Sequence, residues 1–151
     1  MREEIVYLDT SAIVKRYVLE PGSDFIRKLY LRAYSGEVVL SFSAWNIGEV
    51  LGVLDKARGV GRISSEAYAV SRKRFLAETR RLAKLGSLTI VPLRMKILVE
   101  AWKLIEKHHI YEADAVQISS AKYASAQQLI TGDKKLHQSA QIEGVKSVYI
   151  A

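Results

Sequence analysis

Two aspartates follow short apolar segments that are typical of buried β-strands. Asp9 comes directly after residues 5–8, and Asp133 follows residues 129–131 and one glycine. The carboxyl ends of parallel strands meet at one edge of a sheet, where ligands bind, so we expect both carboxylates at that edge. Aspartate is also a preferred residue at the start of a helix, and such capping alone would explain either residue taken singly.

Two further acids lie on expected helices that offer them no polar face. Glu49 is the only charged residue in the segment 38–54, and Asp114 shares its helical face with Ile118 and with small residues. A carboxylate in apolar surroundings is costly unless it is hydrogen-bonded, protonated or bound to a metal. A structural hydrogen bond is the alternative for Glu49. Glu112, at the start of the same helix as Asp114, is the alternative acid there.

Together the four acids predict a site for a divalent cation. Two carboxylates 4 Å apart repel each other by about 4 kcal/mol at an effective dielectric of 20, so a cluster of four would be costly without a cation. Oxygen ligands in a chain without cysteine favour the hard ions Mg²⁺ and Mn²⁺. Thr10, Ser11 and Thr131 could position water beside such an ion. One or two ions of this kind activate water and neutralise charge on a phosphate, which is the chemistry of phosphodiester hydrolysis.

Apart from these acids the chain is strongly basic. It has 23 Lys and Arg residues against 16 Asp and Glu residues, which gives a net charge of +7. Such an excess favours a polyanion such as RNA, although many basic proteins bind no nucleic acid. Lys15, Arg16, Lys134 and Lys135 lie close to two of the acids and are the first candidates to grip a phosphate backbone. A second basic group forms a stripe on one expected helix, for which a solvated helix face is the plainer interpretation and nucleic-acid binding the sharper one: Arg72, Lys73, Arg74, Arg80, Arg81 and Lys84.

Five apolar segments with the length of buried strands alternate with helical patterns. We expect strands at residues 5–8, 38–41, 88–91, 129–131 and 147–150. We expect helices at 11–18, 23–34, 44–57, 64–85, 95–109 and 111–127, and one more that begins at 133. This alternation predicts an α/β fold in which helices cover both faces of a mostly parallel, about five-stranded sheet.

The composition also limits where the protein works. No repeat or linker divides the chain, so we expect a single domain over residues 1–151. The absence of cysteine excludes disulfides and thiolate metal sites, and no apolar segment is long enough for a signal peptide or a membrane span. A cytoplasmic protein without a membrane partner is therefore expected.

In their order and spacing, four motifs resemble those of the PIN-domain family, and especially its VapC-like toxins. They are the segment 7–12 around Asp9, Glu49 in an apolar helix, the pair Asp114 and Ala115 at the start of another helix, and the segment 129–136 around Asp133. Each motif alone is weak, but the set covers nearly the whole chain. The region 59–85 varies across that family and implies nothing about the substrate.

The resemblance implies a three-layer α/β/α sandwich and Mg²⁺- or Mn²⁺-dependent endoribonuclease activity. Asp9, Glu49, Asp114 and Asp133 match the acidic positions of the family, which are its metal-binding and catalytic residues. Thr131 matches the hydroxyl residue that precedes the last acid. The resemblance further implies homodimers and, for VapC-like members, inhibition by a small antitoxin protein that inserts into the active groove.

Three competing functions remain open at the level of sequence. A phosphoaspartyl enzyme could use Asp9 as its nucleophile, but the haloacid dehalogenase pattern requires a second aspartate where Ser11 stands. The second is an RNA-processing nuclease without an antitoxin, and the third is a weakly catalytic RNA-binding module. Metal-dependent cleavage that disappears on Asp9→Asn would separate a nuclease from a binding module.

Overall fold

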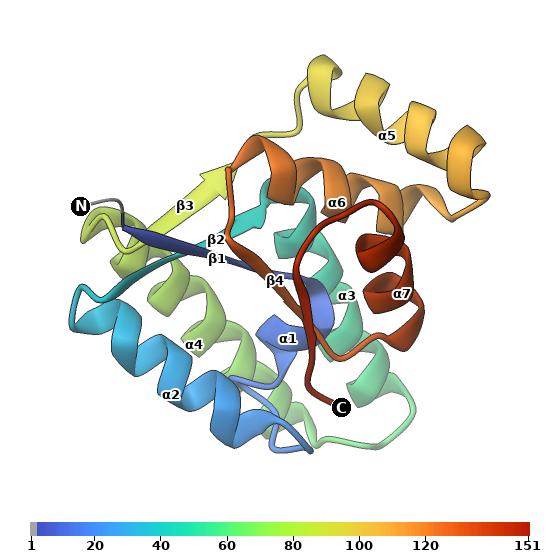
Figure 1. Cartoon of the computed structure of the whole chain (residues 1–151). Helices are drawn as coiled ribbons and strands as arrows, with labels where there is room; N and C mark the ends of the chain where they lie inside the picture. The colour runs from blue at the N-terminus through green and yellow to red at the C-terminus, as the bar shows by residue number, and fades with distance from the viewer. Residues whose placement is uncertain (1–2) are drawn as a thin grey trace.

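A five-stranded sheet forms the centre of the molecule (Figure 1). In the computed structural model, which describes residues 3–151, the strands lie in the order β3-β2-β1-β4-β5, and every neighbouring pair is parallel. The strands are β1 (Glu4–Leu8), β2 (Val38–Ser43), β3 (Leu88–Val91), β4 (Gln128–Thr131) and β5 (Ser147–Tyr149). The predicted mostly parallel sheet of about five strands is confirmed.

Helices cover both faces of this sheet. They are α1 (Thr10–Val14), α2 (Ser23–Tyr34), α3 (Ala44–Gly59), α4 (Ser65–Lys84), α5 (Met95–His108), α6 (Glu112–Tyr123) and α7 (Lys134–Ile142). One buried cluster joins the sheet to α1, α2, α3 and α4, and a second joins it to α5, α6 and α7. The arrangement is the predicted three-layer α/β/α sandwich (Figure 1). None of the helices found in residues 3–151 is long and apolar enough to cross a membrane.

The central strand shows why the strands are apolar throughout. Successive side chains of a strand point to opposite faces of a sheet. Val6 and Leu8 belong to the cluster under α1 to α4, whereas Tyr7 between them belongs to the cluster under α5 to α7. All three are fully buried. A strand covered by helices on both faces needs apolar residues at every position.

Two helices are shorter than their patterns predicted. The first ends at Val14 rather than residue 18, because residues 15–17 turn the chain toward α2. The helix expected to reach residue 127 ends at Tyr123, and Ser125 just beyond it has a left-handed φ of 56°. Both differences lie at helix ends, where side-chain periodicity carries little information.

The direction in which strands are added to the sheet reverses at β1. The chain first adds β2 and β3 on one side of β1, and it later returns to add β4 and β5 on the other side. Leu8 at the end of β1 is paired in register with Ile130 near the end of β4. Asp9 and Asp133 therefore follow two neighbouring strands at a topological switch point, the place where open α/β sheets form their ligand crevice.

A buried carboxylate ties α4 to the helices beside it. Both oxygens of Glu78 accept hydrogen bonds from the Arg16 guanidinium, at 2.9 Å each. The hydroxyls of Tyr17 and Tyr34 also donate to this carboxylate, at 2.9 and 2.8 Å. Burial alone would raise the pKa of Glu78, but the hydrogen bonds from Arg16, Tyr34 and Tyr17 outweigh it and hold the pKa below its usual value.

Replacing Glu78 with alanine is expected to destabilise the fold strongly. The change leaves the half-buried Arg16 charge and two tyrosine hydroxyls without their acceptor, which typically costs about 3 kcal/mol or more. Urea unfolding followed by circular dichroism measures the loss. Glu100→Ala is the matched control, because its carboxylate pairs only with Lys103 on the exposed side of α5 and should cost less than about 0.5 kcal/mol. Similar losses in both variants would contradict a structural role for Glu78.

Candidate active site

A pocket of about 310 Å³ is formed among α1, α3, α6 and α7. Asp9, Glu49, Asp114 and Asp133 all line it, together with the hydroxyl residues Thr10 and Ser11. Four acids that are up to 124 positions apart in sequence therefore face one hollow. Thr131 is fully buried at the end of β4, behind Asp9.

Asp9 is the most deeply placed acid of the pocket, with only 4% of its surface exposed. One carboxylate oxygen accepts hydrogen bonds from the Ala12 backbone N–H at 2.9 Å and from Ser11 Oγ at 2.7 Å. The other accepts from Thr131 Oγ1 at 2.6 Å. Asp9 therefore caps α1, as its residue type allows, and is at the same time held rigidly at the floor of the pocket.

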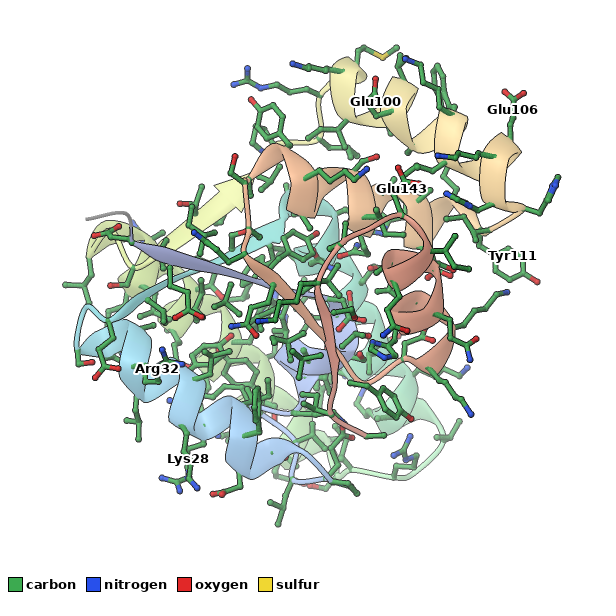
Figure 2. All side chains as sticks on the ribbon, in the orientation of Figure 1. Lys28, Arg32, Glu100, Glu106, Tyr111 and Glu143 are labelled. Carbon is green, nitrogen blue, oxygen red and sulfur yellow. The ribbon has the colours of Figure 1, made fainter. Side chains whose placement is uncertain are left out.

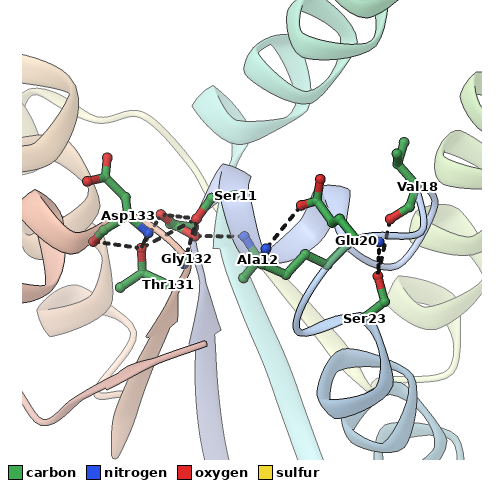
Figure 3. Close-up of polar contacts among 10 residues, drawn as sticks. Ser11, Ala12, Val18, Glu20, Ser23, Thr131, Gly132 and Asp133 are labelled. Carbon is green, nitrogen blue, oxygen red and sulfur yellow. Dashed lines mark hydrogen bonds and ion pairs between the residues drawn. The ribbon is translucent and has the colours of Figure 1, made fainter. Parts of the chain in front are cut away.

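The loop after β4 is built around the same hydroxyls, as Figure 3 shows for Ser11, Thr131, Gly132 and Asp133. The Gly132 N–H donates to Ser11 Oγ at 2.8 Å, and the Asp133 N–H donates to Thr131 Oγ1 at 2.9 Å. A Cβ atom on Gly132 would lie 2.9 Å from Lys15 Cε, so a larger residue here would require the Lys15 side chain to shift. Ser11 and Thr131 thus connect the two strand-end acids through two hydroxyl groups.

Burial of the Asp9 carboxylate disfavours its charged form. Desolvation raises the pKa of Asp9 from 3.8 to about 6, although the hydrogen bonds from Thr131, Ala12 and Ser11 act in the opposite direction. The nearby charge of Asp133 raises the pKa further. At neutral pH the Asp9 carboxylate is therefore a buried negative charge, and it forms no ion pair with any side chain of residues 3–151.

Asp114 and Asp133 differ from Asp9 in exposure. Asp133 is exposed and caps α7 by accepting from the backbone N–H groups of Lys135 and Leu136. Asp114 is half-buried in the first turn of α6. Burial raises the pKa of Asp114, and the charges of Asp133 and Glu49 add to that rise. These mutual effects mean that the three carboxylates are close enough to repel one another.

A network of buried side chains that the sequence did not reveal holds Glu49. Thr10 Oγ1 donates to Glu49 at 2.7 Å and accepts from Asn46 Nδ2 at 3.0 Å. Asn46 Nδ2 also donates to Gln117 Oε1 at 3.0 Å, and the Tyr7 hydroxyl donates to the same oxygen at 2.8 Å. The structural hydrogen bond considered for Glu49 therefore exists, and it fixes that carboxylate at the pocket wall.

Two signals in the sequence could have indicated this network. Asn46 is the only asparagine in the chain and stands three positions before Glu49 on the same helix. Gln117 stands three positions after Asp114 on a helix that is otherwise small or apolar there. The Gln117 Nε2 atom is buried and has no hydrogen-bond partner within the described residues, although Gln117 lines the pocket.

The donor chemistry of the pocket suits a hard divalent cation, although its carboxylates stand apart. The lining offers carboxylate and hydroxyl oxygens, the ligands that Mg²⁺ and Mn²⁺ prefer. Across residues 3–151, no group of three or more His, Asp or Glu side chains is arranged closely enough to hold an ion. Mutual repulsion separates such carboxylates, and exposed Asp133 and half-buried Asp114 can turn toward a cation beside Glu49, which Thr10 holds in place.

Two of the four basic residues expected to grip phosphate have other partners. Arg16 is committed to the Glu78 carboxylate, so that expectation is wrong for Arg16. Lys15 is 8% exposed and its ammonium group pairs with Glu20 at 3.1 Å. Lys134 and Lys135 are exposed beside Asp133, and the Lys135 ammonium group lies 3.6 Å from the centre of the Tyr111 ring.

Comparison with known proteins identifies related sequences and folds. A family model described as the PIN domain matches residues 6–141. No protein with a curated description matches the chain significantly by sequence.

Solved structures of low sequence identity share the fold. VapC20 of Mycobacterium tuberculosis, described as a toxin that cleaves the sarcin-ricin loop, has a TM-score of 0.65 at 14% identity, with 95% of this chain and 98% of that chain covered. FitAcB of Neisseria gonorrhoeae has a TM-score of 0.65 at 18% identity, with 94% and 95% covered. VapBC2 of Rickettsia felis, solved with a DNA fragment from its promoter, has a TM-score of 0.62 at 18% identity, with 97% and 99% covered.

Asp9→Asn is expected to stabilise the metal-free protein at neutral pH. The folded-state pKa of Asp9 lies above its unfolded value, so the charged carboxylate lowers stability above the unfolded pKa, and does so fully above about pH 6. Removing that charge should raise the free energy of unfolding by up to about 3 kcal/mol, since one pKa unit corresponds to about 1.4 kcal/mol. Asparagine keeps the cap on α1.

Urea unfolding with a chelator at pH 7.5 and near pH 4 measures this difference. Below the unfolded pKa, Asp9 is protonated in both states, so the advantage of Asp9→Asn should shrink toward zero as the pH falls. An advantage of the same size at both pH values would show that burial of the charge is not its cause.

Proposed function

This chain belongs to the PIN domain family, and from that premise we propose that it is a metal-dependent endoribonuclease that hydrolyses RNA phosphodiester bonds. We also propose that residues 1–151 act as one nuclease domain in the cytoplasm. The observation that carries the proposal is the buried Asp9 carboxylate at the switch point between β1 and β4, facing Glu49, Asp114 and Asp133 across one pocket. At neutral pH, a ligand of opposite charge would stabilise this costly arrangement.

Asp9, Glu49, Asp114 and Asp133 are the proposed metal-binding and catalytic residues, with Mg²⁺ or Mn²⁺ as the cofactor. When bound, a divalent ion of this kind lowers the pKa of a coordinated water and neutralises charge on the phosphate. Divalent metals are general among PIN domain nucleases, which supports this part of the proposal.

The contribution of the protein itself is to orient these oxygen atoms. Ser11 and Thr131 donate to the Asp9 carboxylate and so aim its remaining lone pairs at the pocket. Thr10, which Asn46 holds in place, does the same for Glu49. Thr131 is therefore proposed as a catalytic-site residue that acts on Asp9 and on the turn to Asp133. Residues fixed in this way need little reorganisation during the reaction.

We further propose that the protein is the toxin of a toxin-antitoxin pair. The fold it shares with VapC20, a toxin by its description, and with VapBC2 supports this assignment. This assignment implies two partners. One is a small antitoxin that enters the acidic pocket, and the other is a second copy of the chain in a homodimer. An RNA-processing nuclease without an antitoxin remains the alternative if no partner inhibits cleavage.

Cleavage of a mixed pool of structured RNAs tests the catalytic proposal. Wild-type protein should cut RNA with Mg²⁺ or Mn²⁺ and not with a chelator, whereas Asp9→Asn and Asp114→Asn should lower the rate by at least about 100-fold. Glu100→Ala, which is remote from the pocket, should retain full activity. Residual activity shared equally by all variants would indicate a contaminating nuclease. Retained RNA binding without any cleavage would support the binding module instead.

Metal binding can be measured without any substrate. Mn²⁺ at about 100 times its dissociation constant should stabilise the wild type by about 2.7 kcal/mol, because the folded state alone binds it. In thermal unfolding, the melting temperature of the wild type should therefore rise with Mn²⁺, while that of Asp9→Asn should change much less. Equal responses of the two proteins would place the metal outside the acidic pocket.

A further inference from the structure

The outer face of α4 carries positive charge that the protein does not neutralise. Arg72, Lys73, Arg80 and Lys84 are exposed and form no ion pair within residues 3–151. The only acid between residues 67 and 84 is Glu78, whose carboxylate is turned inward to Arg16 and the two tyrosines. Like charges on neighbouring turns of one helix repel each other.

Most basic residues on α2 and α5 are paired instead, although Lys56 on α3, Lys96 on α5 and Lys134 and Lys135 on α7 form no ion pair within residues 3–151. Lys28 and Arg27 on α2 bind Asp24, and Arg32 binds Glu4 and Glu37. On α5, Lys103 binds Glu100. Figure 2 shows Lys28 on the outer side of α2, away from the sheet. What distinguishes α4 is that several unpaired basic residues stand together on the exposed face of one helix.

A row of hollows leads from this face toward the acidic pocket, and the ion pair of Lys15 and Glu20 separates the last two. Glu20 lines the acidic pocket and holds the Lys15 ammonium group, and Lys15 lines the next hollow, of about 340 Å³, with Arg74. Arg74 also lines a hollow of about 280 Å³ with Lys73 and Arg81. These last two line a hollow of about 700 Å³, which lies along α4.

Lys15 occupies the junction between the acids and this path. Its aliphatic stem runs so close to two glycines that a Cβ atom would lie 3.0 Å from Lys15 Cδ at Gly22 and 2.9 Å from Lys15 Cε at Gly132. Figure 3 shows Glu20, the acid that the Lys15 ammonium group contacts, on the opposite side of the view from Asp133. Because the stem of Lys15 also lies against Gly132, which directly precedes Asp133, Lys15 spans the distance between these two acids. The basic path therefore begins beside the proposed catalytic residues.

We propose that this path binds the sugar-phosphate backbone of the RNA strand beyond the bond that is cut. We define it as the basic track, which begins next to the paired Lys15: Arg72, Lys73, Arg74, Arg80, Arg81 and Lys84. The inference rests on the proposed ribonuclease function. At a rise of 1.5 Å per residue, the track extends about 16 Å along α4 between Lys73 and Lys84, which is enough to follow several phosphates. Substrates that reach α4 should bind more tightly than substrates that end at the pocket.

The test compares two double variants on two lengths of RNA. Lys73→Gln with Arg80→Gln removes two exposed charges of the track, and Lys28→Gln with Lys103→Gln removes two paired charges elsewhere as the matched control. The substrates are an RNA of about 30 nucleotides that the wild type cuts and one of about 6 nucleotides that spans the same bond. Circular dichroism confirms that both variants fold.

For the long RNA, the track variant should show a KM about tenfold higher than that of the wild type, with kcat unchanged. The slope of log(kcat/KM) against log[salt] should fall by about 1.4, since each phosphate contact on a single strand contributes about 0.7. The short RNA and the control variant should show neither effect. A KM for the long RNA that changes no more than in the control, or an equal change for the short RNA, overturns the proposal.

A binding measurement separates this inference from the proposed function. Fluorescence anisotropy of the labelled long RNA is measured with Asp9→Asn, with and without Lys73→Gln and Arg80→Gln. If the wild type cuts no RNA, the nuclease proposal fails, yet binding that weakens about tenfold when the two α4 charges are removed still supports the track. Unchanged binding overturns the track even when cleavage is observed.

Discussion

The burial of the Asp9 carboxylate is the constraint on which the rest of the site depends. A charge with 4% exposure needs donors on several sides, and here they come from Ser11, Ala12 and Thr131. Two of these donors belong to the helix that Asp9 itself caps, and the third belongs to the neighbouring strand β4. These donors can surround the carboxylate only where β1 and β4 lie side by side. The acidic pocket therefore depends on the order of the strands in the sheet.

A second buried acid in the same molecule shows how a carboxylate with a purely structural role is compensated. Glu78 is compensated by an arginine and two tyrosine hydroxyls, and the pKa of Glu78 lies below its usual value. Asp9 is compensated by neutral donors alone, and burial raises the pKa of Asp9 to about 6. The first carboxylate is fully satisfied within the protein, whereas the second, with Glu49, Asp114 and Asp133 beside it, is not. That difference points to a positively charged ligand at Asp9 and to none at Glu78.

The surface charges show a similar difference, because some basic residues are paired within the protein and others are not. On α2 and α5, most basic residues pair with nearby acids, and such pairs contribute little beyond local neutrality. On α4 the one nearby acid is drawn into the interior by Arg16, which leaves Lys73, Arg80 and their basic neighbours without ion pairs among residues 3–151. A single buried ion pair therefore joins α4 to the core and at the same time leaves its outer face positive. An acidic centre beside a positive path is what a phosphate backbone with one bond in the pocket would require.

The sequence by itself determined the elements, the parallel sheet and the four acids, because strand and helix periods, turn residues and capping preferences act over a few neighbouring positions. It determined less at helix ends, where α1 stops at Val14 and α6 at Tyr123. Only the tertiary structure decided the partners: Glu78 for Arg16, and Asn46 with Gln117 behind Thr10 and Glu49. These contacts join residues 36 to 71 positions apart, and nothing in the local sequence specifies which of many polar side chains will meet once the layers pack together.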